Sequence, residues 1–214
     1  MVTIVYHLFQ SSYIPIDEDT MNNILIINAH HQYPFAEGRL NGTLVDKANS
    51  QLTDMGHTVR VVNVNGCWDI ETELENHTWS DTIILQSPVN WMGVPWTFKK
   101  YMDEVYTAGM SGALTTGDGR TEDAPKANYG AGGTLTGKKY MLSLTFNAPE
   151  EAFNDHAEYL FQGKSVDDLF FPMHMNFRFF GMEPIPTFAC YDVMKNAQPE
   201  KYFEQFASHL SRYY

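Results

Sequence analysis

The sequence has few cysteines and no long apolar run. Its 214 residues include only two cysteines, Cys67 and Cys190, which lie far apart and form no C-x-x-C pair. This spacing argues against a disulfide framework and against a zinc site, and it favours a reducing cytoplasm. No stretch of about 18 apolar residues is present, so we expect no membrane span.

Positive charge is also scarce. Lys and Arg together number 14 against 26 Asp and Glu, which gives a formal net charge of −12 at pH 7. A surface of that sign repels nucleic-acid phosphates and anionic lipid headgroups. We therefore expect neither nucleic acid nor a membrane as a partner.

The usual nucleotide-binding and nucleophile motifs are missing as well. Residues 130–135, GAGGTL, depart from G-x-G-x-x-G at the last position, and GMSGA at 109–113 lacks the spacing of a nucleophile elbow. There is no Walker A lysine motif. No His pair has the spacing of H-E-x-x-H, so we expect no metal site.

What the chain does contain is enough apolar material for one sizeable core. Hydrophobic residues make up 43% and aromatic residues 14%. We expect a single domain over residues 21–214, because the buried-strand pattern NNILIINA begins just after Met21. Residues 1–20 lack the basic start of a signal peptide, and we expect an N-terminal arm of unknown role, with a disordered tail or an upstream start codon as the alternatives.

Strand and helix patterns alternate along this domain. Helical stripes follow the first strand (Leu40, Leu44, Ala48, Leu52, Met55), follow Pro95 (Phe98, Tyr101, Met102, Val105, Tyr106) and end the chain (Tyr202, Phe203, Phe206, Leu210). Short runs rich in apolar residues predict strands at 22–29, 57–64, 81–87, 138–146 and 183–191. The alternation predicts an α/β fold, a doubly wound five-stranded parallel sheet with helices on both faces.

Ligands of such sheets bind beyond the carboxyl ends of the strands, so the loops at 30–39, 88–95 and 147–153 matter most. The loop at 88–95 carries Trp91 and Gly93, which suit a flat apolar ligand. The loop at 30–39 carries Arg39 before a helix N-terminus, a combination that suits a diphosphate and so favours FAD over FMN.

Each of these residues also has a structural interpretation. Trp91 and Trp96 are alternatively core or dimer-interface residues, an interpretation we favour for Trp96 only. Arg39 is alternatively a solvated surface charge, and His30 and His31 alternatively satisfy backbone groups of their loop. The aromatic cluster LFFPMHMNFRFF at 169–180 is expected to serve the core and a dimer contact.

Longer stretches carry a specific resemblance that runs from Met21 to near the C-terminus. In chain order they are NILIINAHHQ, EGRLNGTL, NWMGVPWTFKKYMDEVYTAG, GDGRT, YGAGGTLTGKKYMLSLTFNAPEEAF and LFFPMHMNFRFFGMEPIPTF. In this order they strongly resemble the modulator of drug activity B family of bacterial NADPH:quinone reductases. The resemblance implies a flavodoxin-like fold, bound FAD, NADPH as co-substrate, small-molecule quinones as acceptors and a homodimer.

The resemblance also implies site residues. It places the FAD diphosphate and adenosine on one loop and the isoalloxazine ring on two others. The related animal NAD(P)H:quinone dehydrogenases have a Tyr and a His near the flavin; here Gln162 stands in that region, and His156 and Tyr159 are the substitutes we name as catalytic candidates. The implied cofactor-binding residues are His30, Phe35, Gly38, Arg39 and Leu40 on the first loop, Pro88, Val89, Asn90, Trp91 and Met92 on the second, and Thr145, Phe146 and Asn147 on the third.

The segment from Thr107 to Gly137 holds eight glycines and is long for a loop inside a compact domain. We hypothesise that it covers the cofactor or completes the pocket across a dimer, through Asp118, Gly119, Arg120 and Tyr129. The alternative is a mobile surface excursion.

The mechanism implied is a two-electron, ping-pong hydride transfer from NADPH through flavin N5 to a quinone, with both substrates using one slot. Backbone amides near Asn90 and Asn147 are expected to stabilise charge on the reduced ring. Alternative functions are a flavin-dependent azo- or nitroreductase and an electron-transfer flavoprotein, while a non-enzymatic interaction protein ranks third.

Overall fold

The computed structural model describes residues 21–65 and 67–214, so the expected arm at residues 1–20 lies outside the described residues. The strands are paired in parallel throughout, in the order β2-β1-β3-β4-β5. This arrangement confirms the predicted doubly wound five-stranded sheet, and each strand lies within a residue or two of its predicted range. The strands are β1 (Asn23–Asn28), β2 (Thr58–Asn63), β3 (Thr82–Pro88), β4 (Lys139–Thr145) and β5 (Glu183–Cys190).

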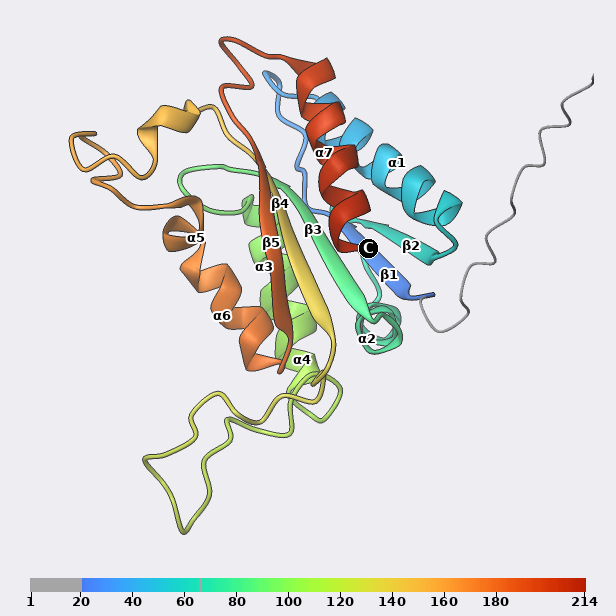
Figure 1. Cartoon of the computed structure of the whole chain (residues 1–214). Helices are drawn as coiled ribbons and strands as arrows, with labels where there is room; N and C mark the ends of the chain where they lie inside the picture. Colours follow the sequence, from blue (N-terminus) through green and yellow to red (C-terminus); the bar gives the residue numbers. More distant parts are fainter. Residues whose placement is uncertain (1–20, 66) are drawn as a thin grey trace, which may run out of the picture.

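Helices cover both faces of the sheet (Figure 1). Alternate strand residues face opposite layers: Leu25 and Ile27 join one buried cluster, whereas Ile24 and Ile26 join the other. One layer contains α1 (Arg39–Asp54) and α7 (Pro199–Tyr213). The opposite layer contains α2 (Ile70–Trp79), α3 (Trp96–Tyr101), η2 (Met102–Tyr106), α4 (Thr107–Gly109), α5 (Val166–Leu169) and α6 (Phe171–Phe179), and a short 3-10 turn, η3 (Glu150–Ala152), follows β4.

The predicted helical stripes are the buried faces of these helices. In α1, Leu44, Ala48 and Leu52 are buried, and Gly56 follows with a positive φ of 97°. The stripe after Pro95 is buried along α3 and η2, but the helix widens to π geometry over Met102–Tyr106. Single π turns inside α-helices are rare and are frequently found at functional sites.

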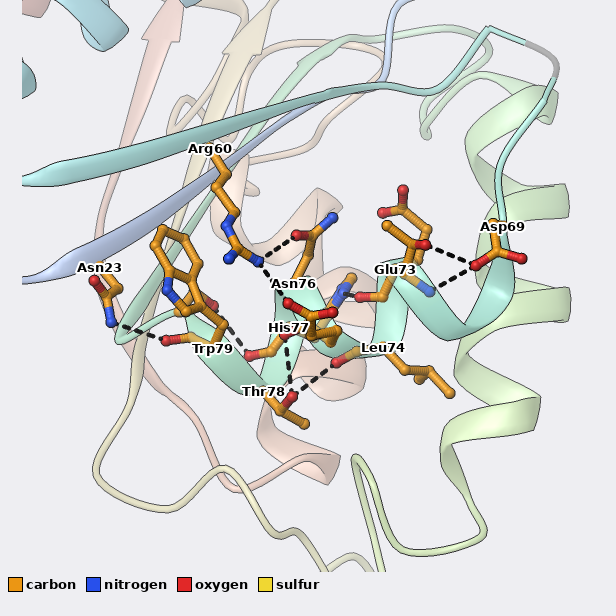
Figure 2. Close-up of polar contacts among 12 residues, drawn as sticks. Asn23, Arg60, Asp69, Glu73, Leu74, Asn76, His77, Thr78 and Trp79 are labelled. Carbon is orange, nitrogen blue, oxygen red and sulfur yellow. Dashed lines mark hydrogen bonds and ion pairs between the residues drawn. The ribbon is translucent and has the colours of Figure 1, made fainter.

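The apolar pattern did not predict α2, because the buried face of this helix is polar. Glu73, Asn76 and His77 are its buried residues. Asp69 caps the helix by accepting a 2.9 Å hydrogen bond from the Thr72 amide, and at the other end the Asn23 side chain donates to the Trp79 carbonyl at 3.3 Å (Figure 2). Side-chain hydrogen bonds therefore fix the two ends of α2, whereas the other long helices pack through apolar side chains.

The buried face of α2 also carries shifted ionisable groups. Tyr101 donates a 2.7 Å hydrogen bond to Glu73, and burial raises the pKa of Glu73 while that hydrogen bond opposes the rise. His77 is fully buried beside them, with Nδ1 2.8 Å from the Glu73 carbonyl oxygen (Figure 2). Burial lowers the pKa of His77 to about 4, so this side chain is neutral at pH 7.

Candidate functional site

The strand order places the candidate site between β1 and β3. These strands are neighbours, yet the chain runs from β1 through α1 in one layer and from β3 through α3 in the other. The loops at their carboxyl ends therefore diverge, and doubly wound sheets bind ligands at such a point. Strand β4 ends at the same edge of the sheet, and the segment that follows β4 begins there (Figure 1).

The loop after β1 presents aromatic rings at this edge. Backbone hydrogen bonds of 3.0 Å in both directions between Tyr33 and Ala36 close a tight turn. Tyr33 and Phe35 stack with ring centroids 5.3 Å apart, and Phe35 is 73% exposed. His31 contacts Trp96 edge-on at 5.3 Å, so the first loop meets the start of α3.

Trp96 itself is 60% exposed. The core interpretation of this residue is therefore wrong within the chain, because Trp96 lies on the loop-facing surface at the first residue of α3. Its interpretation as an interface residue stays a prediction.

The N-terminus of α1 has no side-chain cap. Its N-cap is Gly38, in the left-handed conformation with φ 86° and ψ 12°. A Cβ at this position would lie 2.3 Å from the His30 ring, so only glycine allows the close approach. Among the described residues, the amides of Arg39, Leu40 and Asn41 have no acceptor. An uncapped helix start of this kind favours an anion.

His30 lies directly against this helix start. Its Nε2 atom is buried and has no hydrogen-bond partner in the described part of the chain. Burial lowers the pKa of His30, a hydrogen bond to the Ala36 backbone opposes the shift, and His31 adds to it. A buried, unpartnered ring nitrogen is costly unless a ligand satisfies it.

Arg39, the first residue of α1, is paired with an acidic neighbour in this structure. Its guanidinium pairs with Glu37 at 3.3 Å, and the two side chains are 89% and 65% exposed. The pair is a solvated surface interaction worth little to stability. Arg39 is thus free to exchange Glu37 for a phosphate, and its role toward a ligand stays a prediction.

The loop after β3 is a tight turn with two bulky residues at its tip. Asn90 and Gly93 exchange backbone hydrogen bonds of 2.8 and 3.0 Å. Trp91 and Met92 both have positive φ, 48° and 65°, as in a type I′ turn. Left-handed backbone at two bulky residues costs about 1–2 kcal/mol each and is typical of functional sites.

The turn leaves these side chains in the open. Trp91 is 99% exposed and Met92 47%, and their amides have no acceptor in the described chain. Pro88 ends β3, and the Val89 amide donates to the Thr145 carbonyl at 2.9 Å, which ties this loop to β4. The exposure of Trp91 leaves its ring free to contact a ligand. Its role as a wall for a flat ring stays a prediction.

The residues after β4 divide between core and surface. Phe146 is buried and packs edge-on against Phe153 at 5.2 Å, and its amide donates to the Cys190 carbonyl at 2.8 Å. Asn147 is exposed and makes no hydrogen bond in the described residues. The structure thus places the Phe146 side chain in the core beneath the site, while Asn147 faces outward.

Sequence reasoning missed the polar layer beneath these loops. Asn41, Gln86 and Ser143 are buried and hydrogen-bond to one another and to Thr145. The sequence feature that could have revealed this layer is one polar residue in each of two otherwise apolar strands, Gln86 in β3 and Ser143 in β4. Such a residue is retained in a core only when its partners are present.

The catalytic candidates His156 and Tyr159 lie on the segment that follows β4. Both are exposed, Tyr159 to 90%, and no hydrogen bond joins them in the described structure. The His156 ring lies close to Gly163, where a Cβ would be 2.4 Å from it. Their segment leaves the carboxyl end of β4, and their role in proton transfer stays a prediction.

Asp118 and Tyr129 lie at the opposite edge. Their segment leads into the amino end of β4 and is held there by Leu135, whose amide donates to Phe180 just before β5 (Figure 1). Asp118 pairs with Arg120, whose guanidinium lies 5.6 Å from the Tyr129 ring centroid. The structure corrects the expectation that this segment covers the cofactor of its own chain; contact across a dimer stays a prediction.

Taken together, the carboxyl edge fits a flavin nucleotide. The uncapped start of α1, with Gly38 and the unpartnered His30 nitrogen, suits a phosphate group. The exposed Trp91 and Met92 suit a planar ring. Across residues 21–65 and 67–214 no group of three His, Cys, Asp or Glu side chains is arranged to hold a metal, and no helix has the length and apolar character to cross a membrane.

Comparisons with known proteins agree with this fold. Residues 22–213 match a family described as having a flavodoxin-like fold. The chain is 44% identical to NADPH:quinone oxidoreductase MdaB of Haemophilus influenzae over 190 residues, which cover 89% of this chain and 98% of that protein.

Solved structures are similar in fold at lower identity. An NADPH-quinone reductase from P. pentosaceus matches with a TM-score of 0.61 and 17% identity, covering 90% of this chain and 97% of that one. An FMN-dependent NADH-azoreductase from Bacillus anthracis in complex with FMN matches with a TM-score of 0.62 and 12% identity, covering 89% and 99%. At these identities the likeness shows a shared fold alone.

Proposed function

This chain belongs to the flavodoxin-like family that includes the NADPH:quinone oxidoreductase MdaB, and from that membership we propose that it is an FAD-dependent NAD(P)H:quinone oxidoreductase. The observation that carries the proposal is the pairing, at one edge of the sheet, of an uncapped helix start with an exposed aromatic turn. The first suits the phosphates of a dinucleotide, and the second suits its ring.

The protein's own residues bind and orient, because the bound flavin supplies the hydride chemistry between a nicotinamide and a quinone. The amides at the start of α1 and His30 hold phosphate. Trp91 and Met92 give one apolar wall for a planar substrate stacked on the ring. The amides of Trp91 and Met92, which have no acceptor among the described residues, would offer hydrogen-bond donors to a bound flavin.

FAD is proposed over FMN because two features lie beyond the first phosphate position. Arg39 is exposed and can leave Glu37 for a second phosphate. Phe35, which is 73% exposed, stacks on Tyr33 in the same loop, and this pair suits an adenine ring. We also propose NADPH as the donor and transfer in two alternating half-reactions in which both substrates use one slot.

Azo and nitro compounds are the second candidate class of acceptor. The wall formed by Trp91 and Met92 is apolar and carries no charged group that would select a quinone over another flat electrophile. Comparing kcat/KM for a benzoquinone, an azo dye and a nitroaromatic under one set of conditions ranks these classes.

We also propose that the protein is a cytoplasmic homodimer. Cavities of about 860 and 180 Å³ share Lys99, Met102 and Asn176, and so form one groove from the Met92–Gly93 turn to Tyr129. Exposed apolar side chains border it, including Met110 and Phe171. A second copy seated here would bring Tyr129 toward the neighbouring site, and both cysteines stay free, as a reducing compartment requires. Light scattering across a dilution series tests the dimer.

The function itself is tested with purified protein kept free of oxygen. The protein is titrated with FAD and separately with FMN, and the tighter flavin is then reduced with NADPH while its visible absorption is followed. We expect tighter binding of FAD, bleaching by NADPH and recovery on adding a benzoquinone. Failure to hold either flavin, or a band that no nicotinamide bleaches, contradicts the proposal.

A further inference from the structure

Four buried polar side chains form a line beneath the candidate site. They come from the first turn of α1 (Asn41), from β3 (Gln86) and from β4 (Ser143 and Thr145), and each is 5% exposed or less. Gln86, Ser143 and Thr145 face the layer formed by α1 and α7, because they alternate along their strands with residues of the opposite cluster, and Asn41 belongs to that layer. Such a line inside a core is stable only when every member has a partner.

The hydrogen bonds in this line run in one direction. The Ser143 hydroxyl donates to Gln86 Oε1 at 2.7 Å, and Gln86 Nε2 donates to Asn41 Oδ1 at 2.9 Å. Asn41 Nδ2 then donates to Thr145 Oγ1 at 3.2 Å. Each amide therefore accepts on its oxygen and donates through its nitrogen, so the orientation of Gln86 sets that of Asn41.

The last member is left with a hydrogen to donate. Thr145 Oγ1 accepts from Asn41 Nδ2, and the acceptor of its own hydrogen among the described residues is Asn41 Oδ1 at 3.5 Å. That distance is long for an O–H···O hydrogen bond, and Asn41 Oδ1 already accepts from Gln86. Within the described residues, the buried Thr145 hydroxyl therefore has only this long contact for its own hydrogen, at the carboxyl end of β4.

We propose that Gln86 and Asn41 are positioning residues that fix Thr145 as a hydrogen-bond donor to the flavin. The inference rests on the proposed function, since Thr145 lies at the loop where the cofactor is expected. The same line joins the phosphate end of the site, at the start of α1, to the strands that carry the ring-binding loops. It thereby holds the two halves of the site in one register.

The arrangement predicts what happens when the line is cut. With Gln86→Met, Asn41 Oδ1 loses its donor and becomes a buried, unsatisfied acceptor. The nearest remaining donor is the Thr145 hydroxyl, 3.5 Å away, which then turns inward. Gln86→Met is therefore expected to weaken flavin binding through Thr145, although Gln86 itself is buried away from the ligand.

The test is a double-mutant cycle on flavin affinity. Apo forms of wild type, Gln86→Met, Thr145→Val and the double variant are titrated with FAD and with FMN, and their thermal unfolding is recorded without flavin. We expect each single variant to weaken binding by about fivefold, and the double variant to be no weaker than Thr145→Val alone. Thr145→Ser, which keeps the hydroxyl, should restore binding to within about twofold.

A control separates this effect from general loss of stability. Ser80 is buried at the amino end of β3, and its hydroxyl donates to the His77 carbonyl at 3.1 Å. Ser80→Ala removes one buried hydrogen bond far from the site, so the unfolding temperature should fall while flavin affinity holds.

Three results would overturn the inference. They are wild-type binding by Thr145→Val, equal weakening by Gln86→Met whether or not Thr145→Val is also present, and weakening by Ser80→Ala as large as that by Gln86→Met. If Gln86→Met does not fold, the comparison of Thr145→Val with Thr145→Ser still decides whether the hydroxyl donates to the flavin. Wild-type protein that binds no flavin would instead refute the proposed function.

Discussion

The substitution Gly38→Ala tests the helix start that we assign to phosphate binding. Gly38 has φ 86°, and its Cβ would stand 2.3 Å from Cε1 and 2.4 Å from Nδ1 of His30. A left-handed alanine costs about 1–2 kcal/mol, and the His30 ring must also move out of the contact. For a chain of this size the unfolding temperature should fall by roughly 2–8 °C.

Two other glycines provide matched controls. Gly137 has φ 82° with nothing within 4 Å of its Cβ position, so Gly137→Ala carries the backbone cost without the collision. Gly42 lies inside α1 in open space, so Gly42→Ala should stabilise the protein by about 0.5–1 kcal/mol. Comparing the three variants separates backbone strain, steric contact and helix propensity.

The decisive measurement is flavin affinity, by titration of each apo variant. Because displacing His30 and the first turn of α1 disturbs the anion site, we expect Gly38→Ala to weaken binding by about tenfold or more. Gly137→Ala and Gly42→Ala should bind within about twofold of wild type. If Gly38→Ala binds as well as Gly137→Ala, then His30 and this helix start do not hold the cofactor.

The remaining predictions concern the aromatic turn, the core beneath it and a buried histidine. Trp91→Ala should change the free energy of unfolding by less than about 0.5 kcal/mol, since the side chain is 99% exposed, yet weaken flavin binding about tenfold; unchanged binding would remove Trp91 from the site. Phe146→Ala should cost about 3–5 kcal/mol in urea unfolding because its ring is buried among other aromatics, and a loss near zero would contradict the core placement. Burial lowers the pKa of His77 from its ordinary 6.5 to about 4, so the unfolded chain takes up a proton that the folded chain refuses, and stability falls as pH drops through this window by up to about 3 kcal/mol. His77→Gln should flatten that part of the stability profile, and a profile as steep as that of wild type would show that His77 is not its source.

The fold could be predicted because its strongest signals are local. β1, β3 and β4 are buried on both faces and so read as nearly continuous apolar runs, and α1 and α3 show a clear helical stripe. The alternation of these patterns then leaves few topologies open.

Helix α2 could not be predicted in the same way. Its buried face consists of Glu73, Asn76 and His77. Glu73 accepts from Tyr101 and Asn76 accepts from Arg60, and both of these partners are distant in sequence. A polar residue looks exposed in a sequence unless its partner is known, and the partner is fixed only by the fold.

The sequence by itself determined the sheet, the carboxyl-edge loops and the residues at their tips, because periodicity and turn chemistry act over short stretches. Tertiary structure alone decided which of those residues are buried and which are exposed. It buried Phe146, exposed Trp91, moved Asp118 and Tyr129 to the opposite edge and joined Asn41 to Gln86 and Thr145. Contacts between residues far apart in the chain depend on how the layers pack, and local patterns carry no record of them.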